Sequence, residues 1–493
     1  KGFSGFMKFS TATDYPPRLD AVILHFTQGD SRLPSETAKY DKWLNGTIKK
    51  EKKELKLTGK VGETAVFRPS KGPRVILVGV GKRPVQLEQI RKATAAAVKQ
   101  ARSLHMKRIA TPATGGKRLP YHTVADGTVE GASFADYQFS KYKGDKPRPE
   151  LEFFFISPAK QAASVRKGIR QGSIEARATL LARDLVNEPP SIMNPTNLAA
   201  EARKIGRQSG LSVKVAGPKE IAKLGLNGYL AVSKGSDQPP QFIRLRYTPA
   251  KAKKHIVLVG KSITFDAGGI NLKPSRGGML EIMKMDMGGG AAVLAAMSAL
   301  KALKCPHKVT GYLPATENLL GGSAYKPGDV IKTYNGKTIE IGNTDAEGRV
   351  TLADVLAYAA KQDKPDVIID LATLTMTEVS LGPDYAAVFS NRDDLIETFR
   401  EAGDLTGERV WPLPMPEEYD EMTKSPVADF SNIVQSRAYT LSGPLLLKHF
   451  VGKTPWVHLD IGGPAWSESE KHYLKKGGTG FGARLLIEFI SRY

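Results

Sequence analysis

Short apolar runs alternate with helix-like stretches along this chain, and the alternation limits the folds open to it. The runs are rich in Val, Ile and Phe and are bounded by charged residues, Gly or Pro, which is typical of strands buried in a sheet. They lie at residues 21–25, 74–79, 151–156, 255–260, 309–314, 367–370 and 456–460. Helix-forming segments lie at residues 87–104, 162–186, 291–303 and 352–361. This order predicts an α/β fold.

A pair of prolines indicates where the chain divides. The sequence Asn-Glu-Pro-Pro at residues 187–190 ends the preceding helix, because proline lacks an amide donor and forces an extended chain before it. A chain of 493 residues is also long enough for more than one hydrophobic core. We predict a smaller N-terminal α/β domain over 1–160, a linker helix over 161–190, and a catalytic domain over 191–493 whose mixed sheet is flanked by helices.

Positive charge is concentrated near the start of the chain. The net charge is +22, and residues 1–160 contain 30 Lys and Arg against 15 Asp and Glu. Such a basic domain could attract nucleic acid, an anionic membrane surface or an acidic partner. A lysine-rich soluble exterior, or the basic bias of an organelle-matrix protein, explains the same count. We favour this second explanation because the lysines are scattered among few aromatic residues.

The composition also bears on the compartment. The single cysteine, Cys305, excludes an internal disulfide framework and suits a reducing environment. No apolar run is long enough to span a membrane, and the start of the chain, at Lys1, has no apolar segment of the kind found in secretory signals. We therefore expect an intracellular protein of the cytoplasm or of a mitochondrial or other organelle matrix.

Acidic residues gather in the loops of the predicted catalytic domain. Asp266 follows a strand, whereas Asp286, Asp345 and Glu347 precede helices. Neighbouring carboxylates raise each other's pKa unless cations neutralise them. Alone, each could cap a helix or pair with lysine. As a set, with glycine neighbours that let the backbone approach closely, they predict a two-metal site, and oxygen ligands suit Zn, Mn or Mg.

Four motifs in order along the chain resemble those of the leucine aminopeptidase family of two-metal exopeptidases. They are GKSITFDAGG at 260–269, NLKPS at 271–275, MDMGGG at 285–290 and NTDAEGR at 343–349, the last being the family's signature. The resemblance covers residues 180–493 well and is weak before residue 160. It implies hydrolysis of the N-terminal residue from peptides with a free N-terminus, and a homohexamer with the catalytic domains at its core.

The same resemblance implies a set of metal ligands. Asp266 and Glu347 would each contact both metals, Asp345 would complete one site, and Lys261 with Asp286 would complete the other. A lysine ligand must be neutral, and a nearby dication lowers its pKa far enough to allow this. The alternative for Lys261 is a simple salt bridge to Asp266.

Two further roles follow from the resemblance. Lys273 would stay charged and stabilise the oxyanion formed at the peptide carbonyl. Arg349 would hold a bicarbonate ion that serves as general base, since a guanidinium cannot itself accept a proton. One metal would bind the free α-amino group of the substrate, which restricts cleavage to N-termini.

Three segments depart from the family pattern. Two additional residues lie within 276–280, Met376 replaces the glycine that ends the family's Ala-Thr-Leu-Thr-Gly segment, and 435–444 lacks the expected arginine- and alanine-rich stretch. Met283, Thr373 and Met376 are expected to line the pocket for the first side chain of the substrate. Because Met376 would narrow or reshape this pocket, the family resemblance does not predict a preference for leucine. Two alternatives stay open: a narrow-specificity dipeptidase, and a nucleic-acid-binding or assembly role through the basic N-terminal domain.

Overall fold

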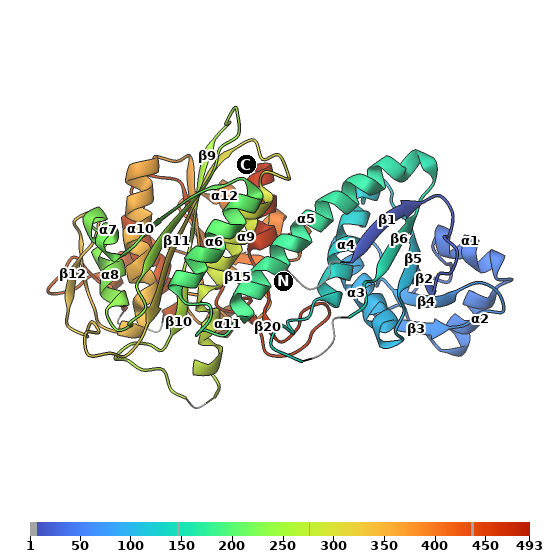
Figure 1. The fold of residues 1–493 in the computed structure, drawn as a ribbon, viewed down its shortest axis with the longest axis horizontal. Coiled ribbons are helices and arrows are strands. Elements are labelled where there is room, and N and C mark those ends of the chain that lie inside the picture. The colour runs from blue at the N-terminus through green and yellow to red at the C-terminus, as the bar shows by residue number, and fades with distance from the viewer. Residues whose placement is uncertain (1–6, 145–147, 276, 435–437) are drawn as a thin grey trace. The chain divides into compact units, whose positions relative to one another are not determined.

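The computed structural model describes residues 7–144, 148–275, 277–434 and 438–493 and divides into two compact units (Figure 1). The N-terminal unit comprises Lys1–Arg177 with Ser469–Lys475, and the C-terminal unit comprises Ala178–Glu468 with Lys476–Tyr493. The division therefore falls inside one helix, α5 (Ala162–Asn187). A short segment from late in the sequence belongs to the N-terminal unit.

Within the described residues, the N-terminal unit contains a six-stranded sheet of order β1-β6-β5-β2-β4-β3. All neighbouring strands are parallel except β3, which runs antiparallel to β4. The strands are β1 (Lys8–Ala12), β2 (Ala21–Phe26), β3 (Thr64–Phe67), β4 (Arg74–Gly79), β5 (Arg108–Pro112) and β6 (Glu152–Ile156). The helices, besides α5, are α1 (Ser35–Trp43), α2 (Thr47–Glu54), α3 (Leu87–Ser103) and α4 (Tyr121–Asp136).

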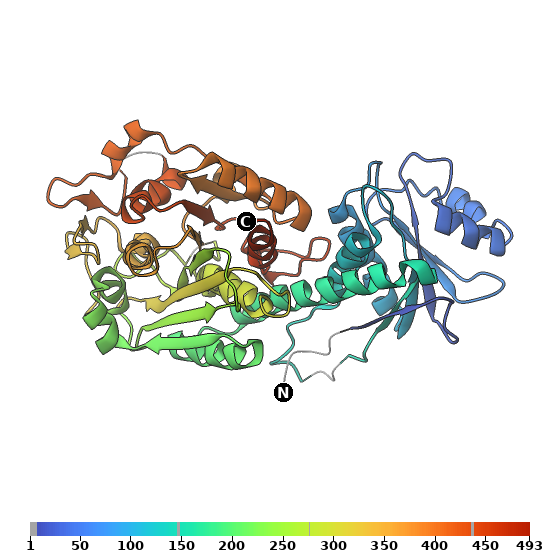
Figure 2. The ribbon, with the colours of Figure 1, turned by 90° about the horizontal axis from the view of Figure 1, so that it is seen from above.

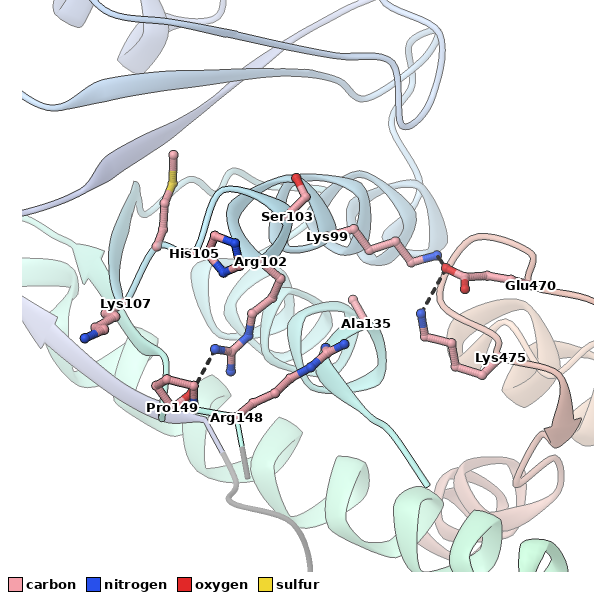
Figure 3. Close-up of a pocket in the computed structure, with 11 residues that line it drawn as sticks. Lys99, Arg102, Ser103, His105, Lys107, Ala135, Arg148, Pro149, Glu470 and Lys475 are labelled. Atoms are coloured by element: carbon pink, nitrogen blue, oxygen red, sulfur yellow. Dashed lines mark hydrogen bonds and ion pairs between the residues drawn. The ribbon is translucent and has the colours of Figure 1, made fainter. Parts of the chain in front are cut away.

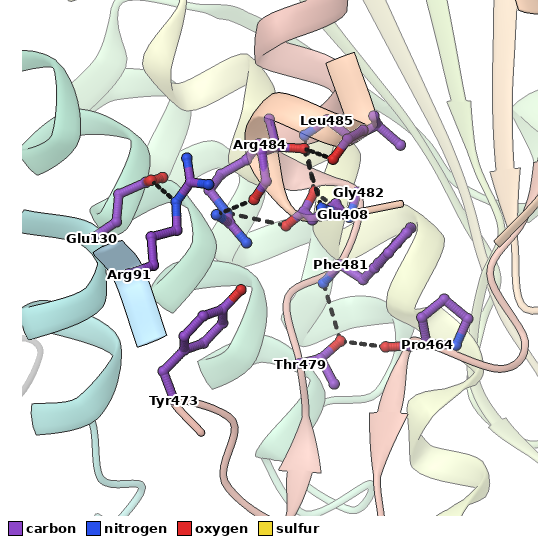
Figure 4. Close-up of polar contacts among 12 residues, drawn as sticks. Arg91, Glu130, Glu408, Pro464, Tyr473, Thr479, Phe481, Gly482, Arg484 and Leu485 are labelled. Atoms are coloured by element: carbon purple, nitrogen blue, oxygen red, sulfur yellow. Dashed lines mark hydrogen bonds and ion pairs between the residues drawn. The ribbon is translucent and has the colours of Figure 1, made fainter. Parts of the chain in front are cut away.

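Helices α3 and α4 pack closely against each other. A side chain at Gly131 of α4 would place its Cβ 2.3 Å from the carbonyl oxygen of Arg91 in α3, so glycine is required at this crossing. The Arg91 guanidinium forms a buried ion pair with Glu130 beside it (Figure 4). The pair of helices is thus held by backbone contact and by a charged interaction.

The sheet of the C-terminal unit is mixed and, among the described residues, nine-stranded, with the order β16-β15-β18-β14-β9-β11-β8-β7 and β10 beside β11. Strands β10, β11, β9, β14 and β18 are parallel, whereas β7, β8 and β15 introduce antiparallel pairs. The strands are β7 (Ser212–Ala216), β8 (Gln241–Tyr247), β9 (His255–Gly260), β10 (Ser262–Asp266), β11 (Lys308–Asn318), β14 (Val367–Ala372), β15 (Ala386–Ser390), β16 (Val410–Pro412) and β18 (Trp456–Asp460). Smaller sheets contain β12 (Val330–Lys332), β13 (Thr338–Glu340) and β17 (Phe430–Ser431), and β19 (Trp466–Ser467) with β20 (Gly477–Gly478).

Helices flank this sheet in both views (Figures 1 and 2). Helix α9 contacts α6 and α14, and helix α10 contacts α8 and α13, while both α9 and α10 pack on the central strands β9, β11 and β14. The helices are α6 (Pro195–Ser209), α7 (Pro218–Leu224), α8 (Asn227–Ser233), α9 (Gly288–Ala299), α10 (Glu347–Asp363), α11 (Glu378–Leu381), α12 (Asp393–Thr406), α13 (Tyr439–Leu447) and α14 (Ala483–Arg492). In the parts of the chain that the structure describes, no helix has the length and apolar character needed to cross a membrane.

A buried carboxylate fixes the start of α14. Glu408 accepts hydrogen bonds from the backbone amides of Gly482, at 3.0 Å, and Leu485, at 2.9 Å, and from Arg484 Nε at 3.2 Å (Figure 4). A carboxylate is favoured at this position because the first amides of a helix lack partners within the helix. The interaction anchors the last helix to the segment before β16.

The predicted fold class is confirmed: both units are α/β, and the C-terminal sheet is mixed and flanked by helices. The predicted starts of two helices were wrong. The helix expected from 291 begins at Gly288, and the one expected from 352 begins at Glu347. Gly288, Gly289 and Gly290 have poor helix propensity, but a Cβ on Gly289 would lie 2.3 Å from the carbonyl oxygen of Leu371, so close packing on β14 outweighs propensity there.

Candidate active site

Two lysines and four carboxylates meet where the parallel strands of the C-terminal sheet end. The carboxyl ends of parallel strands lie at one edge of a sheet, so the loops that follow them come together. The residues and their positions are Lys261 (directly after β9), Asp266 (end of β10), Lys273 (the following loop), Asp286 (the 3₁₀ segment Leu280–Met287), Asp345 (the 3₁₀ turn Thr344–Ala346) and Glu347 (first residue of α10). All six were predicted as site residues, and the fold brings them together.

Lys261 lies between two carboxylates. Its Nζ is 2.8 Å from Asp286 Oδ1 and 2.8 Å from Glu347 Oε1, and it donates to the carbonyl oxygen of Thr373 at 2.9 Å. All four residues are buried. The alternative in which Lys261 forms a simple salt bridge to Asp266 is wrong, because its ion-pair partners are these two other carboxylates.

Lys273 binds the other two carboxylates. Its Nζ lies 2.9 Å from Asp266 Oδ2 and 2.6 Å from Asp345 Oδ1. Asp266 is buried, whereas the Asp345 side chain is about one-third exposed. Each lysine therefore bridges a different pair of carboxylates, and the more exposed side of the cluster lies at Asp345.

Three carboxylates of the cluster are close enough to share cations. Ligand oxygens of Asp266, Asp286 and Glu347 all lie within 4.8 Å of one another. Two buried oxygens, Asp286 Oδ2 and Glu347 Oε2, accept no hydrogen bond from the described residues. A buried carboxylate oxygen without a partner is costly, and divalent cations remove that cost. The donor set therefore fits metal ions that prefer oxygen ligands.

The pKa values of the acids reflect this crowding. Burial, reinforced by Glu347 and Asp266, raises the pKa of Asp286 well above its usual value despite the opposing charge of Lys261. Burial raises the pKa of Asp345 to about 6, with further contributions from Asp266 and Glu347 and with Lys273 opposing. Crowded acids with raised pKa values are typical of functional sites.

The two lysines respond in the opposite direction. Burial by itself lowers the pKa of Lys261, but Asp286, Glu347 and Asp266 outweigh it and raise the pKa above its usual value. The pKa of Lys273 is raised in the same way by Asp266, Glu347 and Asp345. In the absence of metal, both side chains are thus ammonium ions that balance part of the acidic charge.

Hydrogen bonds outside the charged cluster orient its members. Asp266 Oδ1 accepts from the Gly268 amide at 2.9 Å and from Asn318 Nδ2 at 2.8 Å. Thr373 Oγ1 donates to Asp286 Oδ1 at 2.6 Å. Asn318 was not predicted as a site residue, because nothing in a strand-terminal asparagine distinguishes a positioning residue from a turn residue.

Arg349 lies in the first turn of α10 and is buried. Its Nη1 donates to the carbonyl oxygen of Asn432 at 3.0 Å and to Ser442 Oγ at 2.9 Å. Its Nε has no hydrogen-bond partner among the described residues. Burial lowers the pKa of Arg349, although a guanidinium stays charged. A buried cation with a free donor is suited to holding an anion.

The three residues predicted to line a substrate pocket differ in burial and in their contact with the charged cluster. Thr373 lies in the cluster through its bond to Asp286. Met283 is partly buried in the same 3₁₀ segment as Asp286, and Met376 is 50% exposed after β14. Of the segments that depart from the family pattern, Arg276 and residues 435–437 lie outside the described residues.

Comparison with known proteins connects this site to a family. Residues 22–146 match the N-terminal domain of the cytosol aminopeptidase family, and residues 180–487 match its catalytic domain. The chain is 42% identical to a probable cytosol aminopeptidase of Roseiflexus castenholzii over 88% of this chain and 90% of the relative. It is 44% identical to one of Aquifex aeolicus over 91% of each chain.

Solved structures with a similar fold include a leucine aminopeptidase. A mutant of tomato leucine aminopeptidase is similar with a TM-score of 0.88 and 33% identity, covering 99% of this chain and 97% of the other. The bottromycin maturation enzyme BotP in complex with Mn is similar with a TM-score of 0.85 and 32% identity, covering 96% of this chain and 99% of the other. Both likenesses extend over nearly the whole chain.

Proposed function

The chain belongs to the cytosol aminopeptidase family and is a metal-dependent aminopeptidase, and we propose that its cluster of lysines and carboxylates holds two metal ions that activate the hydrolytic water. The observation that carries the proposal is the convergence of Asp266, Asp286 and Glu347, in which buried oxygens of Asp286 and Glu347 have no hydrogen-bond partner among the described residues. We further propose that residues 191–493 form the catalytic domain, with 1–160 as the N-terminal domain and 161–190 as the helix between them.

In this proposal Asp266 and Glu347 would be shared by the two ions, Asp345 would complete the ligands of one ion, and Lys261 with Asp286 would complete those of the other. Zn or Mn, with Mg as a further candidate, suits such a donor set. Bound ions of this kind lower the pKa of a water molecule and polarise a carbonyl group. Lys261 must lose its proton to act as a ligand, so metal binding is coupled to proton release.

Two residues act on the reacting groups without binding metal. Lys273, an ammonium ion beside Asp266 and Asp345, is placed to stabilise negative charge on the carbonyl oxygen of the substrate. Arg349, whose Nε has no hydrogen-bond partner in the described parts of the chain, would hold a bicarbonate ion as general base. The guanidinium orients this anion and does not itself take a proton.

We assign the selectivity of the enzyme for the N-terminal residue of its substrate to Met283, Thr373 and Met376. Met376 is the departure from the family pattern and would narrow or reshape the pocket, so we propose a preference other than simple leucine selectivity. If the reshaped pocket accepts only very few substrates, the enzyme would be a narrow-specificity dipeptidase.

We also propose that the protein forms a homohexamer and lies inside the cell, in the cytoplasm or an organelle matrix. The bacterial relatives and the tomato enzyme named above carry aminopeptidase names, and none of these names supports a nucleic-acid role.

A peptide library tests the proposal directly. The protein loaded with Mn or Zn should release N-terminal residues from unblocked peptides and should leave N-acetylated copies of the same peptides intact. The acetylated set is the matched control, because only the α-amino group differs. Failure of the metal-loaded protein to cleave any unblocked peptide would contradict the proposed function.

A further inference from the structure

A concave pocket of about 500 Å³ lies in the N-terminal unit, at the carboxyl end of α3 (Figure 3). Its walls come from α3, the end of α4, the approaches to β5 and β6, and the segment Ser469–Lys475, all of which belong to that unit. The aminopeptidase chemistry makes no use of this pocket. Its volume is in the range of sites for small organic ligands.

The lining is strongly cationic. Among the described residues that line the pocket, five side chains carry a positive charge and one carries a negative charge. The cationic side chains are Lys99, Arg102, Lys107, Arg148 and Lys475, and the carboxylate is Glu470. A concave surface lined by one sign of charge focuses the electrostatic field and concentrates ions of the opposite sign.

Internal ion pairs neutralise only part of this charge. Glu470 is shared by Lys99 and Lys475, the latter at 2.9 Å. Arg102 is paired in a bidentate manner with Asp136, at 2.6 and 2.8 Å, and donates to the carbonyl oxygen of Pro149 at 2.8 Å. These contacts fix the rim of the pocket. Glu470 neutralises only one of its two lysines, so one positive charge remains uncompensated there. Asp136 compensates the charge of Arg102 fully.

Two further cations add to the excess. Neither Lys107 nor Arg148 forms an ion pair with any residue that the structure describes, and both are exposed. In Figure 3 the Arg148 side chain extends toward Lys475 and Glu470, whereas Lys107 lies at the opposite end of the pocket. The pocket thus presents a guanidinium fork and two ammonium groups on one side, with another ammonium group across from them.

We propose that this pocket binds a small molecule that carries a diphosphate or triphosphate group. A guanidinium recognises phosphate oxygens in a bidentate manner, and ammonium groups bind them as point charges. Several cations around one cavity suit a ligand with several adjacent negative charges better than they suit a ligand with a single carboxylate. Ala135, Met106 and Pro149 provide apolar wall for an organic part of the ligand.

Isothermal titration calorimetry on the full-length, metal-loaded enzyme tests this proposal, with ADP and inorganic pyrophosphate as probes at low ionic strength. The test variants are Arg148→Gln and the double variant Arg148→Gln/Lys475→Gln. Lys53→Gln is the matched control, because Lys53 is exposed on α2 of the same unit and outside the pocket. The wild type and the control should bind with equal affinity, and the double variant should bind at least tenfold more weakly.

Each outcome has a defined reading. A phosphate ligand held by the catalytic metals would bind the double variant as tightly as the wild type, and this result would overturn the proposal. Equal affinity for both probes assigns binding to the diphosphate group alone, and tighter binding of ADP adds a nucleoside contribution. Binding of a single-stranded oligonucleotide without binding of either probe would overturn the proposal in favour of a nucleic-acid surface.

The test remains decisive if the double variant fails to fold. Arg148 is exposed and has no ion-pair partner among the described residues, so Arg148→Gln should leave thermal unfolding unchanged. This variant alone should weaken binding severalfold, and unchanged affinity would contradict the proposal. Peptidase activity without added phosphate should be the same in all these variants.

Discussion

Asn432 and Arg349 are joined by a hydrogen bond of 3.0 Å from the Arg349 guanidinium to the carbonyl oxygen of Asn432. The side chain of Asn432 also donates to the carbonyl oxygen of Asn343 at 2.7 Å and accepts from the Gly342 amide at 2.8 Å. Asn432 is 1% exposed. One residue from a distant part of the sequence therefore holds both ends of the segment 343–349 that supplies Asp345 and Glu347.

Replacing Asn432 with alanine should lower activity without removing the metals. The buried amides and carbonyls that it pairs would lose their partners, at a cost of about 1–3 kcal/mol in the free energy of unfolding. We expect kcat to fall about tenfold to a hundredfold, as is usual when groups that orient metal ligands are removed. Thermal unfolding, kcat and bound metal measured by mass spectrometry test this. Gln208→Ala, which removes an exposed amide on α6, is the control. Unchanged kcat in Asn432→Ala would rule out the positioning role.

The same contact shows what the sequence could and could not predict. Continuous apolar runs identified the central strands, because strands covered on both faces must be apolar throughout. The four carboxylates were identified because acids in loops with glycine neighbours have few structural reasons to cluster, whereas the roles of the lysines came from the resemblance of their motifs to those of the family. Asn432 was missed because its partners are about ninety positions away and a lone asparagine carries no local signal. The membership of Ser469–Lys475 in the N-terminal unit was also not predicted, because the rest of that unit lies far away in the sequence.

Glu347→Gln should abolish metal binding at one or both sites. The amide keeps the shape of the side chain but offers a neutral oxygen, which is a weaker ligand for a dication. Because Glu347 is assigned to both metals, activity should fall by more than the roughly tenfold to hundredfold typical of residues that only support ligands. Bound metal per chain and kcat/KM are the measurements. Glu397→Gln, on the exposed face of α12, should retain both. Full metal content in Glu347→Gln would show that the ligand assignment is wrong.

The contribution of Asp345 to the stability of the metal-free protein should fall as the pH rises from about 4 to about 6. The pKa of Asp345 is raised from 3.8 to about 6 in the folded protein. A raised pKa in the folded state means that the folded state is favoured while the group is protonated. This stability is fully present below the unfolded-state value and is lost as the pH passes the folded-state value. For Asp345, after allowance for solvent screening, the loss should be about 1 kcal/mol.

The measurement is thermal unfolding of the metal-free full chain against pH, for the wild type and Asp345→Asn. The asparagine variant cannot ionise at this position, so the difference in stability between the two proteins should move in its favour across this pH window. Acids far from Asp345 titrate alike in both proteins and cancel in the comparison. A constant difference from pH 4 to pH 7 would show that Asp345 is not perturbed in the absence of metal.

Lys273→Met should reduce kcat while leaving metal content intact. Removing one preorganised donor from a developing oxyanion costs about a hundredfold to a thousandfold in kcat. Lys273→Arg should recover part of that loss, because it restores a positive charge with a different geometry. Steady-state kinetics and bound metal separate this role from ligation. Loss of metal in Lys273→Met would assign Lys273 to the metal centre instead.

Met376→Gly should change which N-terminal residues are removed. Met376 stands where the family pattern has glycine, and its side chain is 50% exposed, so replacing it should not disturb the core. If it narrows the pocket, its removal should raise kcat/KM for bulky N-terminal residues over small ones by about tenfold, the scale on which apolar pockets discriminate. Comparing the library profiles of the two proteins, with Val379→Gly as an exposed control nearby on α11, measures the change. Identical profiles for wild type and Met376→Gly would place the determinant of specificity elsewhere, and the next candidate would be Met283, which lies on the same segment as the proposed ligand Asp286.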